Sequence, residues 1–544
     1  MLAGLMQDVP LLVTSILTYA ASAHADREVV SRTPEGRTHR YDWAGVAERA
    51  RLAAGALQRL GVKPGDRPAT LAWNTHRHLE LFFAVPGMGA VLNTVNPRFF
   101  DAQIIYVLDH AGSEVLLFDP SFMPLVERIA PHLKTVKTFV LLADDDAHES
   151  GAVGAVNWEG LLRAEAEAAH APFAWPDLEE SAGCFLCYTS GTTGDPKGVL
   201  YSHRAVVLHA MACSLPAAFG VTAFDTVMPG TPLFHATGWG FPFVAAIAGA
   251  KYVLTGEKLD PASLESLIEA EGVTVSAGVP TLWTQYLKHL DEAERRPATL
   301  KRLFVGGSAV PPALSHGMHA LGVEVTQLWG MTELCPLGVV STPTPALQAL
   351  GEDAMRETLW TRQGRLQFGV ELKIVGDDGR EAPRDGATSG ALMVRGPWTV
   401  RRYFRKDADA TDADGWFDTG DIATLDPQGF IRITDRKKDV IKSGGEWISS
   451  IDLENEAAGC PGVKIAAVVG VPHPKWEERP VLVIERLDGA VLDQKAVIEF
   501  LKPRVAKWWL PDAVEFAPVP LTATGKIDKK VLRERYRDRL MAQA

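Results

Sequence analysis

Hydrophobic and polar positions alternate between two periods along most of this chain. Through residues 43–60 the apolar side chains recur at helical spacing, and the pattern stops at Gly61 and the Pro64-Gly65 pair. The same criteria predict strands at 67–72, 115–118 and 138–142 and further helices at 80–91 and 120–133. A chain in which helices and buried strands alternate is expected to form α/β layers with substantial parallel sheet.

The pattern changes near residue 369. Strands separated by turns are predicted at 370–375, 391–395 and 430–434, and a charged run, Asp435-Arg-Lys-Lys-Asp439, follows them. Beyond this run the alternation resumes, with a helix at 451–458, a strand at 465–471 and a helix at 493–501. A charge run is usually a solvated face, and its place between two patterned regions predicts a boundary before a small C-terminal domain.

The composition narrows the class of protein. With 544 residues the chain is too long for one hydrophobic core, so more than one domain is expected. Hydrophobic residues make up 47% and charged residues 22%, which is typical of globular proteins. The net charge of −12, without a long basic run, argues against nucleic acid as a principal partner. A polyanionic ligand must therefore be held by local basic clusters.

Cysteine content indicates the redox compartment. The chain has five cysteines, an odd number that does not form a disulfide framework, so we expect a reducing cytoplasm. Cys184 and Cys187 form a C-x-x-C pair, for which zinc or redox chemistry is one alternative. The apolar run around them favours a buried strand in which both thiols are core residues.

The N-terminal region has two interpretations. Residues 10–25 are apolar and end in small residues, as a signal peptide does, but no Lys or Arg precedes them. An opening amphipathic helix is therefore the favoured interpretation. No apolar run reaches the roughly 18–20 residues of a membrane-spanning helix.

One segment carries the strongest chemical signal. Residues 188–198 read Tyr-Thr-Ser-Gly-Thr-Thr-Gly-Asp-Pro-Lys-Gly, and we call them the signature loop. Glycines let successive backbone N–H groups turn toward an anion, hydroxyls add donors and the lysine adds charge, so the loop suits phosphate. It is not a Walker A motif, which has Gly-Lys followed by Ser or Thr. A plain solvated turn is the alternative.

Three later segments add complementary chemistry. In Thr326-Gln-Leu-Trp-Gly-Met-Thr-Glu333, an aromatic can stack on a purine and a carboxylate beside phosphates can ligate Mg²⁺, although Trp329 alone reads as core. In Asp418-Thr-Gly-Asp421, a carboxylate can accept hydrogen bonds from a ribose diol. Thr522-Ala-Thr-Gly-Lys-Ile-Asp528 offers a turn lysine, which in isolation reads as solvated surface.

Taken in order, these segments resemble the motifs of the AMP-forming adenylating enzymes: acyl-CoA synthetases, adenylation domains and firefly-type luciferases. The likeness extends from about Leu11 to near the end of the chain. It implies an α/β fold, with a large N-terminal domain of layered α/β subdomains and a small mobile α+β C-terminal domain. The domains it implies are 1–434 for ATP and acyl binding, 435–440 as a hinge and 441–544 as the mobile domain.

The resemblance also implies roles at the nucleotide site. Residues implied in ATP and AMP binding are Thr189, Ser190, Gly191, Thr192, Thr193, Gly194, Lys197, Gly307, Ser308, Gln327, Leu328, Trp329, Gly330, Met331, Thr332, Asp421, Arg436 and Lys526. Magnesium would be held by Thr192 and Glu333, and the catalytic set would be Lys526, His235, Glu333 and Thr192. The family usually has Tyr at the position of Trp329, so ring stacking is kept but a phenol contact is not.

The resemblance places coenzyme A at the domain junction. Asp435 would be the pivot, and the coenzyme A path would be lined by Lys442, Ser443, Gly444, Gly445 and Trp447. The coenzyme A phosphates would meet Arg436, Lys437, Lys438, Lys475 and Arg479. For Lys437 and Lys475 a solvated surface position is an equal alternative.

The acyl pocket bears on the choice of acid. Amino-acid adenylation domains carry an aspartate in the pocket, and residues 233–240, Leu-Phe-His-Ala-Thr-Gly-Trp-Gly, contain no carboxylate, so a simple carboxylic acid is expected. The stretch looks like that of bacterial medium- and long-chain fatty acyl-CoA ligases and methylmercaptopropionate-CoA ligases. The implied acyl-pocket residues are His235, Trp239, Gly306 and Val310, with Trp239 as a gate or, alternatively, ordinary core. Relatives often carry Val-Asn-Ala where residues 236–238 are Ala-Thr-Gly, which makes a branched or ring-bearing acid an alternative substrate.

The expected activity is that of an ATP-dependent acid–CoA ligase with ATP, Mg²⁺ and coenzyme A. A medium- or long-chain fatty acid or a thioether acid is the expected substrate, and a non-catalytic nucleotide- and acyl-binding relative is the alternative of another class. Luciferase-type oxygenation is disfavoured because the chain ends without a peroxisomal tripeptide. Fatty-acid relatives are often homodimers, so residues 11–25 are a candidate interface.

Overall fold

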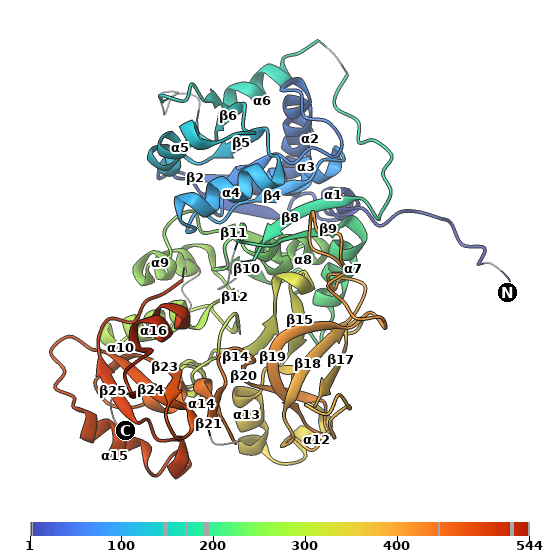
Figure 1. The fold of residues 1–544 in the computed structure, drawn as a ribbon. Helices are drawn as coiled ribbons and strands as arrows, with labels where there is room; N and C mark the ends of the chain where they lie inside the picture. The colour runs from blue at the N-terminus through green and yellow to red at the C-terminus, as the bar shows by residue number, and fades with distance from the viewer. Residues whose placement is uncertain are drawn as a thin grey trace.

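The computed structural model describes most of the chain. The described residues are 2, 4–144, 151–169, 171–189, 195–443, 446–522 and 527–541, without the side chains of 446 and 447. Figure 1 shows two stacked α/β layers at the N-terminal end, an antiparallel sheet below them, and the C-terminal elements beside that sheet.

A seven-stranded sheet forms the N-terminal layer. Its strands lie in the order β7-β6-β5-β3-β4-β8-β9, all parallel except the antiparallel pair β8–β9. The strand bounds are β3 Ala69–Leu71, β4 Leu92–Thr94, β5 Val115–Phe118, β6 Thr138–Leu141, β7 Val156–Asn157, β8 Gly183–Tyr188 and β9 Gly198–Ser202. Helices α4 (Asp101–Ala111) and α5 (Met123–Ile129) share an apolar cluster with this sheet.

A thirteen-stranded sheet forms the second layer and changes character along its width. Strands β1 and β10 to β14 pair in parallel, with β2 antiparallel at one edge, and the sheet continues through β14 into antiparallel strands. The bounds of the first part are β1 Glu28–Arg32, β2 Thr38–Asp42, β10 Thr226–Pro229, β11 Lys251–Leu254, β12 Val275–Gly278, β13 Arg302–Val305 and β14 Glu324–Gly330. The bounds of the second part are β15 Leu337–Val340, β16 Gly364–Leu366, β17 Glu371–Val375, β18 Gly390–Arg395, β19 Phe417–Leu425 and β20 Phe430–Arg436.

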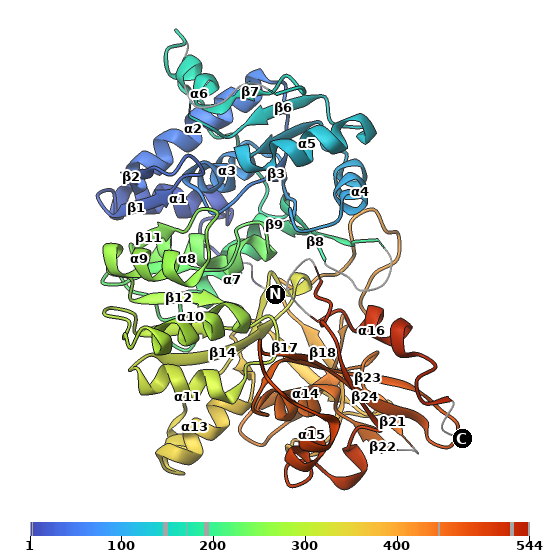
Figure 2. The same ribbon diagram turned by 90° about the vertical axis from the view of Figure 1, so that its left-hand side faces the viewer.

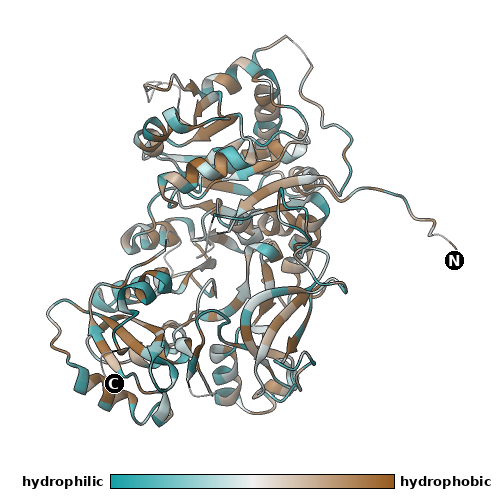
Figure 3. Ribbon diagram, viewed as in Figure 1, coloured by the Kyte–Doolittle hydropathy of each residue, from teal (hydrophilic) through white to brown (hydrophobic). Residues whose placement is uncertain are grey.

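Helices separate and cover these two sheets. Helix α3 (His76–Gly87) has all twelve residues buried and contacts both β8 and β1, and Phe82 packs on Phe185 and Phe243. The other helices of this region are α1 Val13–Ala23, α2 Trp43–Arg59, α6 Trp158–Ala166, α7 His203–Ser214, α8 Phe241–Ala248, α9 Pro261–Glu271, α10 Pro280–Glu292, α11 Pro312–Ala320, α12 Pro345–Gln348 and α13 Glu352–Thr361. In Figure 3 the strands are largely brown, and teal gathers on loops and outer helix faces, as burial of an apolar core requires.

The C-terminal elements form a separate small sheet. Strands β22-β21-β24-β23 pair in that order and β25 joins β24, so the α+β prediction for this region is confirmed. The bounds are β21 Ile441–Ser443, β22 Glu446–Ile448, β23 Val463–His473, β24 Glu477–Arg486, β25 Ala513–Phe516, α14 Ser450–Ala458, α15 Gln494–Leu501 and α16 Lys529–Tyr536. Figures 1 and 2 both show this part beside the antiparallel strands, and Arg432 on β20 pairs with Asp452 on α14 at 2.8 Å.

Two predicted helices differ from the observed ones. The helix expected at 80–91 begins at His76, because the Thr75 hydroxyl caps it by accepting from the His78 N–H, and it ends at Gly87. The helix expected at 120–133 is divided into two short 3-10 turns around α5, where Pro120, Pro124 and Pro131 lack the N–H that a continuous helix needs.

The expectations for the opening helix and for the Cys184–Cys187 pair are confirmed. The opening helix is α1, which packs on α2, α3, α7 and α8. Cys184 and Cys187 lie buried in β8, and burial raises the pKa of the Cys187 thiol to about 11, as suits a core residue rather than a reactive one. No helix in the described part of the chain is both long and apolar enough to cross a membrane.

Candidate functional site

The signature loop lies at the tip of the β8–β9 hairpin. Tyr188 pairs with Gly198 in the antiparallel ladder. The Thr189 N–H donates to the Lys197 carbonyl at 2.9 Å, and the Lys197 N–H donates to Thr189 Oγ1 at 3.3 Å, which closes the base of the loop. The loop residues 190–194, which include Ser190, Gly191, Thr192, Thr193 and Gly194, lie outside the described residues.

The C-terminal end of the loop contacts Tyr403 and Phe404. The Lys197 ammonium lies 4.8 Å from the centroid of the Tyr403 ring, a cation–π distance. The Gly198 carbonyl accepts from the Phe404 N–H at 2.8 Å. A Cβ at Gly198 would lie only 3.2 Å from the Leu186, Phe404 and Tyr188 side chains, so this glycine permits close packing of the hairpin.

Glu333 is a buried carboxylate on a tight turn. It lies in the 3-10 turn Thr332–Leu334 after β14, is 8% exposed, and accepts from the Tyr403 hydroxyl at 2.8 Å. The Tyr201 hydroxyl donates to the Thr332 carbonyl at 2.5 Å and ties the turn to β9. Burial raises the pKa of the Glu333 carboxyl, while the Tyr403 hydrogen bond and the charges of Arg436 and Lys197 oppose the rise.

These residues fit a magnesium ion that is shared with a nucleotide. Within the described ranges, no group of three His, Cys, Asp or Glu side chains forms a protein-only metal site. Mg²⁺ is usually bound by one or two carboxylates together with substrate phosphates and water. Glu333 supplies such a carboxylate near the base of the signature loop, where a cation would also offset the cost of burying the charge.

Trp329 and Asp421 come together from β14 and β19. The Trp329 Nε1–H donates to Asp421 Oδ2 at 2.9 Å, and Arg436 Nε lies 2.7 Å from Asp421 Oδ1. Asp421 and Arg436 are also register partners in the β19–β20 ladder, and Asp421 is 2% exposed. Two donors from different elements therefore orient one buried carboxylate, as a ribose-binding group requires.

Other residues implied in nucleotide binding lie on β14, just after it, or just after the neighbouring strand β13. The buried Gln327 side chain donates to the Trp360 carbonyl, and Leu328 closely approaches Gly306. A Cβ at Gly330 would lie 2.1 Å from the Pro336 carbonyl oxygen, so no larger residue fits there. Met331 is partly buried against the main apolar cluster, and Ser308 is exposed.

Asp435 lies at the junction between the two parts of the chain. It is 1% exposed and accepts from the Ser450 N–H at 2.6 Å, the Ser450 hydroxyl at 3.0 Å and the Arg436 N–H at 2.7 Å. Burial raises the pKa of the Asp435 carboxyl, and the charge of Lys529 acts against this. β20 ends at Arg436 and β21 begins at Ile441, so the residues between them connect the two sheets.

A basic pocket opens at this junction. It has a volume of about 280 Å³ and is lined by Gly420, Arg436, Lys437 and Lys438. Lys437 Nζ lies 3.5 Å from Asp418 Oδ2, and partial burial lowers the pKa of Lys438. Arg436 and Lys437 each pair with a carboxylate, and Lys438 gives the lining one cation more than these pairs, so the hollow would attract an anionic ligand such as a phosphate.

The predicted coenzyme A path is only partly described. Ser443 is buried, and its Oγ accepts from Arg479 at 3.2 Å. The Arg479 guanidinium also pairs with Asp512 at 2.6 Å and donates to two backbone carbonyls, so here it stabilises the C-terminal domain. Gly444, Gly445 and the Trp447 side chain lie outside the description, as does Lys526. Lys442 is exposed, and Lys475 lies 4.7 Å from the Trp476 ring centroid.

Two of the predicted acyl-pocket residues, His235 and Trp239, lie at one turn. Ala236, Thr237 and Trp239 have φ of 40°, 46° and 56°, a left-handed conformation that non-glycine residues rarely adopt. This places the buried Trp239 ring against Gly307, where an added Cβ would lie 3.6 Å from the indole. His235 is half-buried at the start of this turn, and Gly306 and Val310 are buried on the segment that follows β13.

Two residues that contact segments of the site, Asn74 and Tyr403, belong to none of the motifs. The Asn74 amide donates to the Thr231 carbonyl at 2.9 Å and its oxygen accepts from the Leu233 N–H at 2.7 Å, which holds the segment before His235. Tyr403 contacts both Lys197 and Glu333. Nothing in the sequence pattern marks either residue, because each acts through partners that are distant along the chain.

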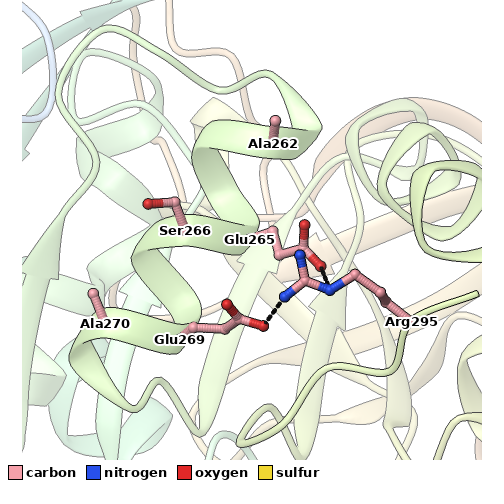
Figure 4. A pocket seen from close by; sticks show the side chains of 6 residues that line it. All are labelled: Ala262, Glu265, Ser266, Glu269, Ala270 and Arg295. Atoms are coloured by element: carbon pink, nitrogen blue, oxygen red, sulfur yellow. Dashed lines mark hydrogen bonds and ion pairs between the residues drawn. The ribbon is translucent and has the colours of Figure 1, made fainter. Parts of the chain in front are cut away.

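A second pocket lies on α9 (Figure 4). It is lined by Ala262, Glu265, Ser266, Glu269, Ala270 and Arg295. Arg295 lies 3.1 Å from Glu265 and also contacts Glu269, while His289 lies 2.9 Å from Glu265. Because these charges compensate one another, the hollow is an ion-paired surface feature.

Comparison with known proteins covers nearly the whole chain. Residues 17–404 match the family described as AMP-binding enzyme, and residues 452–526 match its C-terminal domain. The chain is 44% identical over 537 residues to 3-methylmercaptopropionyl-CoA ligase of Ruegeria pomeroyi, covering 98% of this chain and 99% of that one. It is 45% identical over 537 residues to long-chain-fatty-acid–CoA ligase of Thermus thermophilus, covering 98% and 97%.

Solved structures agree with this assignment. ATP-bound MatB from Rhodopseudomonas palustris superposes with a TM-score of 0.80 at 26% identity, covering 96% of this chain and 99% of that one. The family match, the identity to full-length relatives and the shared fold extend over both domains. The chain therefore belongs to the family of AMP-binding enzymes.

Proposed function

We propose that this protein is an AMP-forming acid–CoA ligase. A carboxylate and ATP would give acyl-AMP and pyrophosphate, and coenzyme A would then displace AMP to give the acyl thioester. The observation that carries the proposal is the pair of contact sets beside the end of β14, Lys197–Tyr403–Glu333 and Trp329–Asp421, in a chain that matches CoA ligases over almost its full length.

The first half-reaction forms the mixed anhydride. A substrate carboxylate oxygen attacks the α-phosphorus of ATP, and the bond to the pyrophosphate oxygen breaks. The signature loop and Lys197 would bind the leaving phosphates, Asp421 would accept hydrogen bonds from the ribose, and Lys526 would stabilise the charge that develops at the α-phosphorus. A bound Mg²⁺ held by Thr192 and Glu333 would neutralise phosphate charge.

The second half-reaction uses the small domain. We propose that residues 1–434 bind ATP and the acid, that 435–440 act as a hinge at Asp435, and that 441–544 rotate. The coenzyme A thiol would attack the acyl carbonyl, and AMP would leave. Ser443, Gly444 and Gly445 would line the thiol path, and the basic pocket of Arg436, Lys437 and Lys438 suits the coenzyme A phosphates.

The acid belongs, in our proposal, to the fatty or thioether class. The names of the two relatives support medium- or long-chain fatty acids and 3-methylmercaptopropionate-like acids. The small side chains of Ala236 and Gly238 in the turn before Trp239 leave an aryl or branched acid as the second candidate.

Carboxylate-dependent exchange of pyrophosphate into ATP tests this function. The assay would use short, medium, long, thioether and aryl acids at equal concentration, followed by thioester formation with coenzyme A. Exchange with thioether or fatty acids is the expected result. Exchange only with aryl acids would refute the substrate class, and no exchange with any acid would favour a non-catalytic binding protein.

We also propose a homodimer formed through residues 11–25 and a cytoplasmic location. Tyr19 on α1 is 49% exposed, while the opposite face of this helix packs on the chain itself. The five cysteines are free and buried, which suits a reducing compartment. Light scattering of the wild type and Tyr19→Glu would test the interface, since a monomeric wild type excludes it.

A further inference from the structure

Tyr403 lies between two groups that the proposed function assigns to MgATP. Its ring centroid is 4.8 Å from the Lys197 ammonium, and its hydroxyl donates to Glu333 Oε1 at 2.8 Å. Lys197 directly precedes β9, whereas Glu333 follows β14. One half-buried side chain therefore connects two segments that are distant along the chain.

We propose that Tyr403 is a positioning residue for adenylate formation. Its ring holds the Lys197 side chain in place, and its hydroxyl sets the orientation of the Glu333 carboxylate. The inference rests on the proposed function, because it concerns the groups that would bind the ATP phosphates and Mg²⁺. Tyr403 acts through these two side chains and not on the reacting atoms.

The hydroxyl contact matters because Glu333 is the carboxylate available to the ion. Glu333 is 8% exposed and sits on a three-residue turn, so its side chain would otherwise choose among several rotamers. A hydrogen bond to a carboxylate is among the stronger ones in proteins, and it fixes Oε1. Mg²⁺ demands nearly ideal octahedral geometry, so the direction of the carboxylate affects its affinity.

The ring contact affects the lysine independently of the metal. The face of the Tyr403 ring attracts the Lys197 ammonium. This contact restricts the rotamers of the exposed lysine before the ligand binds, so less side-chain entropy is lost on binding. This contact is kept by phenylalanine and lost with leucine. The two functions of Tyr403 can therefore be separated by substitution.

The backbone around Tyr403 is held by its own contacts. The Val400 N–H donates to the Glu333 carbonyl at 2.7 Å, and the Phe404 N–H donates to the Gly198 carbonyl at 2.8 Å. Residues 400–404 thus join the turn of Glu333 to the start of β9 without the Tyr403 side chain. Variants at Tyr403 are expected to keep this connection and to fold.

The test compares Tyr403→Phe and Tyr403→Leu with the wild type. Calorimetry would measure ATP binding with Mg²⁺ and in EDTA, and thermal unfolding would check the fold. Tyr403→Phe is expected to weaken MgATP binding about tenfold and to leave metal-free ATP binding within about twofold. Tyr403→Leu is expected to weaken metal-free ATP binding as well, by about threefold. Saturating Mg²⁺ should restore kcat for pyrophosphate exchange in Tyr403→Phe while the KM for Mg²⁺ stays raised.

Tyr252→Phe is the matched control. Its hydroxyl is buried and has no hydrogen-bond partner among the described residues, so removing it should change neither binding measurement. Equal losses with and without Mg²⁺ in Tyr403→Phe, or no loss at all, would overturn the proposal. A wild type that binds no MgATP and catalyses no exchange would instead refute the proposed function, and this inference would fall with it.

Discussion

Replacing Lys529 by methionine removes the cation beneath the domain junction. The Lys529 ammonium lies 2.9 Å from Glu454 Oε1 and donates to the Ser450 hydroxyl at 2.5 Å, and Ser450 donates to Asp435. Burial raises the pKa of both the Asp435 and the Glu454 carboxyls, and the charge of Lys529 lowers them. The variant leaves two carboxylates in a buried site without this cation.

The structure sets the size of the effect. The side chains of Lys529 and Glu454 are 11% and 12% exposed, so both groups are largely removed from water. Removing one partner of a buried ion pair costs about 3–5 kcal/mol, and we expect about 3 kcal/mol here because both groups retain some contact with water. The loss should appear in the free energy of unfolding of the C-terminal domain.

The effect depends on pH with a defined sign. A carboxyl whose pKa is higher in the folded state than in the unfolded state destabilises the fold at pH values above its folded pKa. Without Lys529 both folded pKa values rise further, so the deficit is largest at pH 7–8. Acidification toward pH 5 protonates the folded carboxyls first, so the deficit should shrink.

Backbone amide hydrogen exchange of the C-terminal strands in increasing urea at pH 8, 6.5 and 5 measures this quantity, because it reports the opening of this domain separately from the rest of the chain. Lys530→Met is the matched control, because Lys530 is exposed and its loss should stay within about 0.5 kcal/mol. A deficit below about 1 kcal/mol, or one that grows on acidification, would refute the reasoning.

Three further substitutions test the site. Lys526→Ala should abolish acyl-AMP formation, measured by pyrophosphate exchange, and largely spare thioester formation from synthetic acyl-AMP; equal loss of both steps would contradict the domain rotation. Trp329→Phe removes the indole N–H that donates to Asp421, and a hydrogen bond to a charged group is worth about 1.5–3 kcal/mol. AMP binding, measured by calorimetry, should weaken about tenfold. Unchanged affinity would show that Asp421 is oriented without Trp329. Asn74→Ala removes the partner of the Thr231 carbonyl and of the Leu233 N–H, and it should raise the KM for the acid more than the KM for ATP. An equal rise in both KM values would mean a general loss of fold.

The positions of helices were predictable where the capping residue and the amphipathic pattern agree with the face that packs on the core. The helices expected at 43–60 and 451–458 are α2 and α14, because an amphipathic pattern and a cap from Asp42 or Ser449 act on the same residues. The helix expected at 80–91 was displaced because α3 is buried on all sides, so its apolar pattern carries no face that would mark its ends.

The candidate site was predictable as a set of motifs but not as a geometry. The signature loop, Glu333 and Asp421 were marked by residue type and order. The link from Lys197 through Tyr403 to Glu333 was not, and neither was the hold of Asn74 on the segment before His235. A tyrosine or an asparagine is common anywhere in a chain, and only its partners make it part of a site.

The sequence by itself determined the family, the two-domain α/β organisation and the chemical groups available for adenylate formation. These follow from local patterns and from several motifs that occur in the order of one family, although each motif alone has a structural alternative. Only the tertiary structure decided that Trp329 donates to Asp421, that Tyr403 joins the signature loop to Glu333, and that Lys529 lies beneath Asp435. Such contacts depend on strand register and on packing between segments that lie about 70 or more residues apart along the chain, and no local pattern encodes those distances.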